Sequence, residues 1–520
     1  MYNRNRIKIR GGKMSVIILD FKGQYSQLIA RRVRDLGVFS KILPGDSPID
    51  EIKNEKPEAI ILTGGPDSVY EKDAIHPDEK LFEIGVPILG ICYGAQLMSY
   101  MLGGNVQKAD PSEAEYGKAI ANYEESLLFD GLKSGAVWMS HTDFIDKLPE
   151  GFKPIAKTKN CNTAAIADES RKLYATQFHP EVNNTEHQQE IFKNFLFKIA
   201  KITPNWSSED FIEKSIKEIR EKIGDGNAIL GLSGGVDSSV AAALVSKAIG
   251  DRLTCIFVDH GLLRMNEAEE VEKVFKEKFN VKFKKIDAKD RFLEKLKGVT
   301  EPEKKRKIIG EEFIRVFEDA KKDAKDAKFL VQGTIYPDVV ESGLKKGDVI
   351  KSHHNVGGLP EDVDFELVEP LRMLFKDEVR TVGRLLGLPD HMVDRHPFPG
   401  PGLAIRVIGE ITEERLDILR RVDKIYIDML HEYNLYGKIW QAFAVLPDIK
   451  TVGVQGDKRT YSYLAAIRAV RTTDAMTADA YPFDPEFLDE AQRRIINGVP
   501  EVNRVVYDIT SKPPGTIEWE

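Results

Sequence analysis

The sequence predicts an α/β protein with two doubly wound α/β domains, followed by a smaller α+β C-terminal domain. The chain has 520 residues, which at about 150 residues per domain suggests three or four domains. Two successive stretches alternate short apolar runs with amphipathic helical patterns, which is typical of buried parallel strands joined by helices. The tail instead combines strand patterns with two long amphipathic helices, so a third parallel sheet is not expected.

The expected domains follow these changes of pattern. A flexible extension is expected at residues 1–14, because this basic stretch lacks the apolar core of a secretory signal. The first domain, 15–202, should contain strands at 16–19, 59–62 and 86–91 and helices at 24–36 and 186–202. The second, 203–395, should contain strands at 228–232, 253–258, 281–286 and 329–332 and helices at 238–249 and 267–279. The third, 396–520, should contain strands at 403–408 and 451–454, one long strand or a strand pair at 460–470, and helices at 413–433 and 485–497.

Composition excludes several classes of function. The 75 Lys and Arg residues against 83 Asp and Glu give a net charge of −8, and sequence-blind binding of nucleic acid needs a basic face. No apolar run is long enough to span a membrane. The three cysteines form no C-x-x-C pair, so neither a disulfide framework nor a structural zinc site is expected. We therefore expect a cytoplasmic protein without nucleic-acid or membrane partners.

Cys92 lies in G-I-C-Y-G, where a strand pattern meets a helix pattern. Gly90 and Gly94 flank it at −2 and +2, as in a nucleophile elbow with cysteine in place of serine. A helix N-terminus would favour the thiolate at this position. Taken alone, Cys92 could equally be a buried core cysteine.

Two further motifs favour catalysis. His179 and Glu181 are two residues apart on an extended segment, so both side chains can point to one side. An imidazole that deprotonates a thiol, oriented by a carboxylate, follows the logic of a catalytic triad. Gly64 and Gly65 follow another strand and allow backbone N–H groups to face an oxyanion.

The motifs G-I-C-Y-G-A-Q, F-H-P-E and L-T-G-G-P together resemble class I glutamine amidotransferases over the whole first domain. The resemblance implies that Cys92 attacks the side-chain amide of glutamine, that His179 is its base, and that Glu181 orients His179. It also implies that the ammonia released is used at a partner active site. The oxyanion-binding N–H groups implied by the resemblance are those of Tyr93 and of Gly64 or Gly65.

A second motif, L-S-G-G-V-D-S-S, runs from a strand through a glycine-rich turn into a helix. Glycines let backbone N–H groups approach a phosphate, and a helix N-terminus adds a favourable dipole. The motif lacks the Gly-Lys-Ser/Thr of a Walker A loop, so simple γ-phosphate hydrolysis is not implied. The residues expected to bind ATP are Ser233, Gly234, Gly235, Val236, Asp237, Ser238 and Ser239.

This loop resembles the pyrophosphate loop of N-type ATP pyrophosphatases, which adenylate an oxygen of their substrate and release pyrophosphate. The resemblance implies ATP and Mg²⁺ as cofactors, with Asp237 helping to hold the Mg²⁺ on the phosphates. Without the resemblance, Asp237 could be a capping carboxylate in the first turn of a helix.

Four segments of the remaining chain resemble glutamine-hydrolysing GMP synthases, namely K-S-H-H-N at 351–355, R-H-P-F-P-G-P-G at 395–402, T-V-G-V-Q-G-D at 451–457, and residues 502–520. The family resemblance then extends from about residue 15 to residue 520. It implies that XMP is adenylated by ATP and aminated to GMP, with AMP, pyrophosphate and glutamate as the other products. It also implies a homodimer formed through the third domain.

The tail supplies groups suited to a nucleoside monophosphate. Arg504 and Lys512 offer cations for its phosphate, and Glu518 could accept a hydrogen bond from a purine N–H or a ribose hydroxyl. The family resemblance adds Arg306, which by itself would be interpreted as a solvated helix charge. The residues expected to bind XMP are Arg306, Gln441, Arg504, Lys512, Ile517 and Glu518.

Three other functions are compatible with parts of the sequence. A glutamine-dependent NAD synthetase would carry its glutaminase cysteine in a different setting. A tRNA thiolation enzyme would need a sulfur-carrying cysteine and a basic RNA face, and Cys255, in a buried strand pattern, is a poor carrier. A nucleotide-sensing protein with inactive sites is disfavoured by the intact motifs around Cys92 and Asp237.

Overall fold

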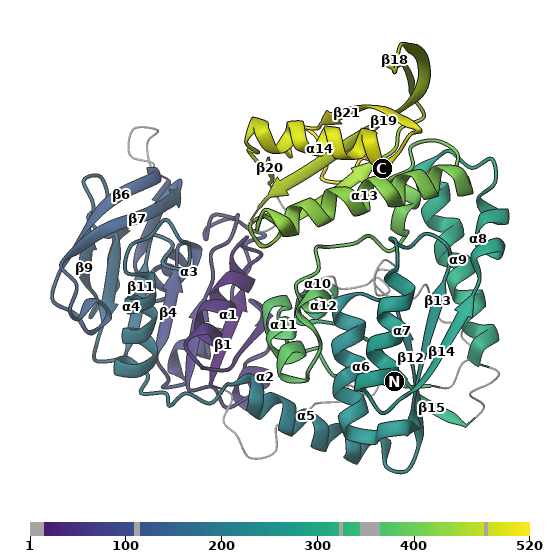
Figure 1. The fold of residues 1–520 in the computed structure, drawn as a ribbon. Coiled ribbons are helices and arrows are strands. Elements are labelled where there is room, and N and C mark those ends of the chain that lie inside the picture. The colour runs from purple at the N-terminus through teal and green to yellow at the C-terminus, as the bar shows by residue number, and fades with distance from the viewer. Residues whose placement is uncertain (1–14, 109–114, 322–325, 344–364, 473–476) are drawn as a thin grey trace. The chain divides into compact units, whose positions relative to one another are not determined.

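The computed structural model describes residues 15–108, 115–321, 326–343, 365–472 and 477–520. The expected extension at 1–14 and the K-S-H-H-N segment at 351–355 lie outside the described residues. The chain divides into two compact units, with the division between Ser207 and Ser208 (Figure 1). In the described residues, no helix combines the length and apolar character needed to cross a membrane.

The first unit contains a nine-stranded sheet with the order β2-β1-β3-β4-β11-β10-β9-β6-β7. The pairings from β2 to β11 are parallel and the others are antiparallel. Its strands are β1 (Val16–Asp20), β2 (Ser40–Pro44), β3 (Ala59–Leu62), β4 (Ile88–Ile91), β6 (Glu115–Tyr123), β7 (Ser134–His141), β9 (Lys153–Lys157), β10 (Ala165–Asp168) and β11 (Leu173–Thr176). A ribbon of β5 (Asn105–Lys108) with β8 (Asp143–Lys147) and the helices α1 (Ser26–Asp35), α2 (Ile49–Asn54), α3 (Tyr93–Met101) and α4 (Gln188–Lys193) complete it.

Burial explains why the apolar runs of this unit form parallel strands. Every residue of β1, β3 and β4 is buried, which requires cover on both faces of the sheet. Helix α1 turns Ile29, Ala30 and Val33 inward and leaves Arg31, Arg32 and Asp35 half-buried or exposed. Arg34 is the buried exception, and it donates to the backbone oxygen of Ser40 at 2.9 Å. The expected strands and the helix at 24–36 are confirmed within a few residues at their ends. The helix expected at 186–202 is α-helical only over Gln188–Lys193 and continues as a π-helix over Asn194–Ile199.

The second unit begins with a parallel five-stranded sheet, β14-β13-β12-β15-β16. Its strands are β12 (Asn227–Leu232), β13 (Leu253–Asp259), β14 (Lys282–Asp287), β15 (Ala327–Val331) and β16 (Glu366–Val368). Its helices are α5 (Ser208–Ile223), α6 (Val236–Ile249), α7 (Glu267–Lys278), α8 (Lys289–Leu296), α9 (Pro302–Lys321), α10 (Tyr336–Gly343), α11 (Lys376–Leu385) and α12 (Asp390–Val393). Because the strands are parallel, the loops that follow β12, β13 and β15 meet at one edge of the sheet, where ligands of such sheets bind.

The same unit ends in an α+β part, as expected. Long strand β19 pairs antiparallel with β17, β18 and β20 and parallel with β21. The elements are β17 (Gln441–Val445), β18 (Lys450–Gln455), β19 (Lys458–Arg471), β20 (Asp479–Ala480), β21 (Val502–Tyr507), α13 (Glu413–Glu432) and α14 (Pro485–Gly498). One hydrophobic core runs from Ile229 of β12 to Leu419 of α13 and Val502 of β21. The proposed domain boundary at residue 396 stays a prediction.

One expected strand is wrong. Residues 403–408 do not form a strand: Gly402–Ile405 is a 3₁₀ helix, and only Val407 makes a single bridge, to Leu446. The cause is the preceding turn, where Gly402 has φ +62° and a Cβ there would lie 2.3 Å from the backbone oxygen of Leu262. Only glycine tolerates both conditions, so the chain turns sharply where the apolar residues alone predicted extended backbone.

Candidate active sites

Cys92 stands on a strained turn between β4 and α3, with φ 52° and ψ −106°. A non-glycine residue with positive φ is uncommon and concentrates at functional sites. The flanking positions must be glycine because the backbone packs closely there. A Cβ on Gly90 would lie 2.5 Å from the Gly94 oxygen, and one on Gly94 would lie 2.5 Å from the Leu62 oxygen. The structure thus contains the elbow geometry that the G-I-C-Y-G motif predicted.

His179 and Glu181 follow β11 and lie beside this cysteine. The Nδ1 of His179 is 2.7 Å from the Oε1 of Glu181, and both side chains are buried. Burial alone would lower the pKa of His179, but the charge of Glu181 and the hydrogen bond with Cys92 raise the pKa well above its usual range. A raised pKa makes the imidazole a better acceptor for the thiol proton, which is the role of the base in a Cys–His pair.

Gly64 lies beside Cys92 and His179, and Gly65 follows it in the chain. A Cβ on Gly64 would lie 3.3 Å from the His179 ring and 3.8 Å from the Cys92 Cβ, so the backbone closely approaches both. The Thr63 hydroxyl donates to the Gly64 carbonyl oxygen at 2.9 Å, and in a planar peptide this turns the Gly65 N–H the opposite way. Among the described residues, no backbone acceptor pairs with the N–H of Gly65 or Tyr93.

Sequence reasoning missed three polar side chains around the cysteine. Gln177 points its Nε2 at the Cys92 sulfur, 3.8 Å away. Gln96 donates to the backbone oxygen of Asp143 at 2.8 Å and contacts Gln177. His141 is buried against the same oxygen, and burial lowers its pKa. Gln96 ends the G-I-C-Y-G-A-Q motif and Gln177 directly precedes F-H-P-E, but nothing in the sequence indicates which way either amide faces.

The glycine-rich loop after β12 forms the turn that the sequence predicted. Gly234 has φ +76°, and Gly235 caps α6 in an extended conformation. The hydroxyls of Ser233 and Ser238 lie 3.0 Å apart across the loop, while the Ser239 side chain is buried beneath it. The turn presents the first N–H groups of α6, which is suited to an anion.

Asp237 and Val236 open helix α6, and the two differ in exposure. Val236 is buried, whereas the Asp237 carboxylate is partly exposed and holds Lys376 with both oxygens at 2.7 Å. Lys376 begins α11 and was not expected from the sequence. It lies 139 residues away in the chain, and no motif marked it.

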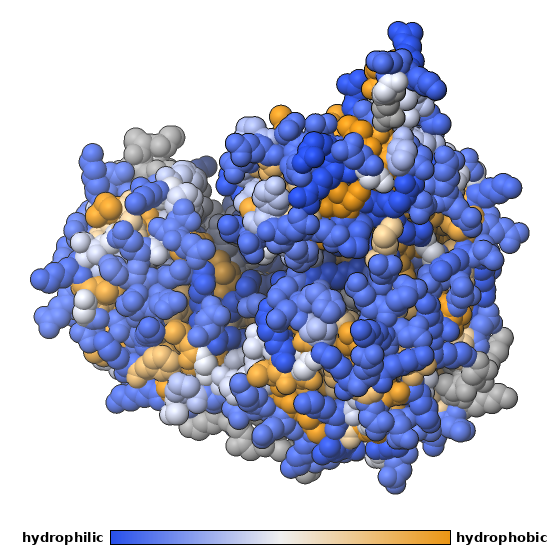
Figure 2. Space-filling view, in the orientation of Figure 1, coloured by the Kyte–Doolittle hydropathy of each residue, from blue (hydrophilic) through white to orange (hydrophobic). Residues whose placement is uncertain are grey.

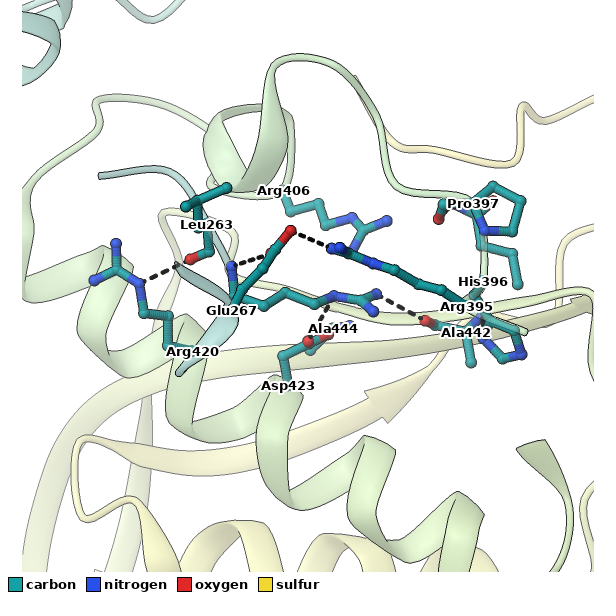
Figure 3. Close-up of polar contacts among 12 residues, drawn as sticks. Leu263, Glu267, Arg395, His396, Pro397, Arg406, Arg420, Asp423, Ala442 and Ala444 are labelled. Carbon is teal, nitrogen blue, oxygen red and sulfur yellow. Dashed lines mark hydrogen bonds and ion pairs between the residues drawn. The ribbon is translucent and has the colours of Figure 1, made fainter. Parts of the chain in front are cut away.

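A group of arginines lies near the R-H-P-F segment (Figure 3). The guanidinium groups of Arg264, Arg395 and Arg406 each lie 5.0–5.1 Å from the centre of the Phe398 ring. Glu267 pairs with Arg395 at 2.6 Å, and Arg395 also donates to the carbonyl oxygen of Gly234. The arginines therefore connect the phosphate loop with the start of the C-terminal part, a link that sequence reasoning missed.

Four of the residues expected to bind XMP are connected through the end of the chain. Glu518 is held by Arg406 at 2.8 Å and by the Nε2 of Gln441 at 2.7 Å. Arg306, on α9, donates to the backbone oxygen of Glu520 at 2.6 Å. The backbone oxygen of Ile517 accepts from the buried Arg468 at 2.8 Å.

The other two residues of this set come from β21 and from the segment that follows it. Arg504 is exposed on β21, and its Nε is 3.4 Å from the Thr451 hydroxyl. Lys512 is half-buried, and its backbone pairs with Ala478. Arg504 therefore contacts β18, and the backbone of Lys512 pairs with the residue before β20. 

Comparisons with known proteins cover nearly the whole chain. Residues 17–199 match the family glutamine amidotransferase class-I, residues 207–315 match NAD synthase, and residues 428–519 match the GMP synthase C-terminal domain. The chain is 59% identical over 508 residues to the glutamine-hydrolysing GMP synthase of Caldicellulosiruptor saccharolyticus, covering 97% of this chain and 99% of that protein. It is 56% identical over 510 residues to the enzymes of that name from Clostridium botulinum strain Langeland and Clostridium tetani, covering 98% of this chain and 100% of each.

Proposed function

The chain belongs to the glutamine-hydrolysing GMP synthases, and on that premise we propose which residues perform each half of the reaction. The enzyme is an ATP-dependent ligase that aminates XMP to GMP with ammonia taken from glutamine. The observation that supports this function is the match over nearly the full length of both chains. A match to one domain alone would not show which substrate accepts the ammonia. The nearly full-length match also sets aside the NAD synthetase alternative, although the middle of the chain matches that family.

In the first unit, Cys92 is the proposed nucleophile. Its thiolate attacks the carboxamide carbon of glutamine, and the N–H groups of Tyr93 and of Gly64 or Gly65 hold the oxyanion that forms. His179, held by Glu181 at 2.7 Å, gives its proton to the departing ammonia. Water then cleaves the thioester and releases glutamate.

In the second unit, the loop of Ser233 to Ser239 is proposed to bind the phosphates of ATP. The positive φ of Gly234 and the N-terminus of α6 support this role. The 2-oxygen of XMP attacks the α-phosphorus and pyrophosphate leaves, which gives adenyl-XMP; ammonia then displaces AMP and gives GMP. The contacting residues of the loop are proposed to be Ser233, Gly234, Gly235, Val236, Asp237, Ser238 and Ser239.

Mg²⁺ fits beside Asp237. The ion is commonly held by one or two carboxylates, with substrate phosphates and water supplying its other ligands. This matches a partly exposed carboxylate, and in the described part of the chain no group of three or more His, Cys, Asp or Glu side chains forms a metal cage. When bound, the ion neutralises charge on the phosphates. Lys376 would then share the carboxylate or turn to a phosphate.

XMP is proposed to bind at the C-terminal part. Glu518 and Gln441 lie at hydrogen-bond distance from each other, which supports their joint recognition of a base or ribose. Arg306 reaches the same chain end from α9. Arg504 and Lys512 are proposed to bind the phosphate, with the Ile517 backbone beside Glu518.

A homodimer is proposed through the sheet of β18 and β19. Val452 and Val454 alternate on one face of β18, Val452 pairs directly with Tyr461 on β19, and all three side chains are more than half exposed. Figure 2 shows apolar surface below the hydrophilic tip of this hairpin. Exposed apolar faces of this kind mark association sites. Light scattering should show that Val454→Glu lowers the molar mass, whereas Tyr116→Glu, an exposed aromatic on β6, should leave it unchanged.

The proposed location is the cytoplasm, since Cys92, Cys161 and Cys255 are all free thiols. The test of the whole function is product analysis by mass spectrometry with XMP, ATP, Mg²⁺ and glutamine labelled with ¹⁵N at its side-chain amide. GMP carrying the label, with AMP and pyrophosphate, is the expected result. GMP without the label, or ADP in place of AMP, would contradict the proposal.

A further inference from the structure

In the described residues, the sulfur of Cys92 has two polar neighbours besides His179. The backbone oxygen of Ser140 lies 3.6 Å from it, and the Nε2 of Gln177 lies 3.8 Å from it. A carbonyl oxygen can only accept, so it suits the neutral thiol. An amide N–H can only donate, so it suits the thiolate, and hydrogen bonds to charged groups are about twice as strong as neutral ones.

The orientation of the Gln177 amide follows from a single backbone atom. The oxygen of Asp143 accepts, so the Gln96 atom that lies 2.8 Å from it must be the amide nitrogen. That nitrogen also lies 3.4 Å from the side chain of Gln177, which must therefore present its oxygen there. The nitrogen of Gln177 is left facing the sulfur. A flipped amide would set two nitrogens against each other.

We propose that Gln177 is a positioning residue for the nucleophile, whose side-chain N–H donates to the Cys92 sulfur and stabilises the thiolate. The proposal rests on Cys92 being the glutaminase nucleophile. Gln177 is 1% exposed, so water does not compete for its N–H, and a donor fixed in advance costs no reorganisation when the charge forms. Gln96 acts indirectly, because its contact with the side-chain oxygen of Gln177 fixes the orientation of that amide.

The other titratable groups around the sulfur are few. His179 with Glu181 supplies the imidazolium, and buried His141 faces the same region, with its Nε2 4.0 Å from Glu115. The low pKa of His141 keeps it uncharged near neutral pH. The hydrogen bond from Gln177 therefore adds to the stabilisation of the thiolate by the imidazolium of His179.

The test is the pH dependence of Cys92 alkylation by iodoacetamide in the full-length enzyme, followed by peptide mass mapping so that the two other cysteines do not interfere. Gln177→Met keeps the approximate length of the side chain and removes the donor. We expect the pH midpoint of alkylation to rise by about one unit, which corresponds to the loss of one charge-assisted hydrogen bond. The kcat for glutamine hydrolysis at neutral pH should fall about tenfold, with KM changed less than twofold.

Gln177→Glu keeps the shape and sets a negative charge beside the sulfur, so its midpoint should rise further than that of Gln177→Met. It also serves as the decisive variant if Gln177→Met does not fold, with ammonia-driven GMP formation reporting the integrity of the chain. Gln107→Met, on the exposed face of β5, is the matched control and should leave the midpoint in place. Unchanged midpoints in both Gln177 variants would overturn the proposal. Failure of the nucleophile assignment would appear separately, as glutamine-driven synthesis that survives Cys92→Ala.

Discussion

The candidate glutaminase site and the candidate nucleotide site differ in how their charges are arranged. In the first unit, nucleophile, base and carboxylate already touch in the order that catalysis needs. In the second unit, the groups expected to bind substrates are paired with the protein's own charges. The pairs are Asp237 with Lys376, Glu518 with Arg406, and Arg306 with the backbone of Glu520.

This difference follows from what each site must hold. Glutamine brings no net charge to Cys92, so the polar groups there can be fixed in advance. ATP and XMP bring several negative charges, and cations left unpaired until the nucleotides arrive would be costly where they are buried. The partly exposed Asp237–Lys376 pair exchanges partners cheaply, whereas Arg406 is fully buried and is expected to keep Glu518 in place.

The largest expected effect separates the two sites completely. Cys92→Ala removes the only proposed nucleophile, so glutamine-driven GMP formation should fall by at least about 10³-fold. Formation of GMP from ammonium chloride should be unchanged, because the second unit keeps all its groups. Both rates are measured by the appearance of GMP. If the ammonia-driven rate fell equally, the two sites could not be treated as separate.

Asp237→Asn should affect the second site alone, and it comes next in size. If the carboxylate holds Mg²⁺, both the glutamine-driven and the ammonia-driven rates should fall by about 10²–10³-fold, since a catalytic metal supplies several kcal/mol. Pyrophosphate release measures this. Asp290→Asn is the matched control, because Asp290 also lies in the first turn of a helix, α8, and is exposed. Equal small losses in the two variants would mean that Asp237 is only a helix cap.

The elements that sequence reasoning predicted well are those whose cause is local. The elbow at Cys92 is set by two neighbouring glycines, and the His179–Glu181 contact by residues two apart on one extended segment. Buried parallel strands such as β1 and β3 are continuous apolar runs, and helices such as α13 show a regular apolar face. Each of these patterns is complete within a short window of sequence.

The features that escaped prediction depend on distant partners. Residues 403–408 looked like a strand because nothing in them shows that Gly402 must fit against Leu262. Arg406 and Arg468 are fully buried, against the ordinary preference of arginine for the surface, because Glu518, Asp508 and backbone oxygens of the chain end receive them. The set expected to bind XMP stays a prediction; the structure shows only that Gln441 donates to Glu518. The buried arginines that hold the chain end were not in that set.

Glu181→Gln tests how far the first site depends on its fixed charges. The change removes the carboxylate that raises the pKa of His179, so the imidazolium loses its proton at lower pH. The alkaline limb of the pH profile for glutamine hydrolysis should move to lower pH, and kcat at neutral pH should fall about 10–100-fold. Glu190→Gln, exposed on α4, should change neither. A kcat loss without a shifted limb would assign Glu181 a structural role only.

The smallest expected effect comes from a single phosphate contact. Lys512 is half-buried and is proposed to bind the phosphate of XMP. Lys512→Ala should raise the KM for XMP about tenfold and leave the KM for glutamine within twofold, because a single phosphate contact is lost. Lys512→Arg keeps the charge and should recover most of the affinity. A rise in KM that is equal for XMP and glutamine would show that Lys512 supports the fold of the tail. The nucleotide site would then depend on the buried arginines that hold Glu518, and not on partly exposed cations such as Lys512.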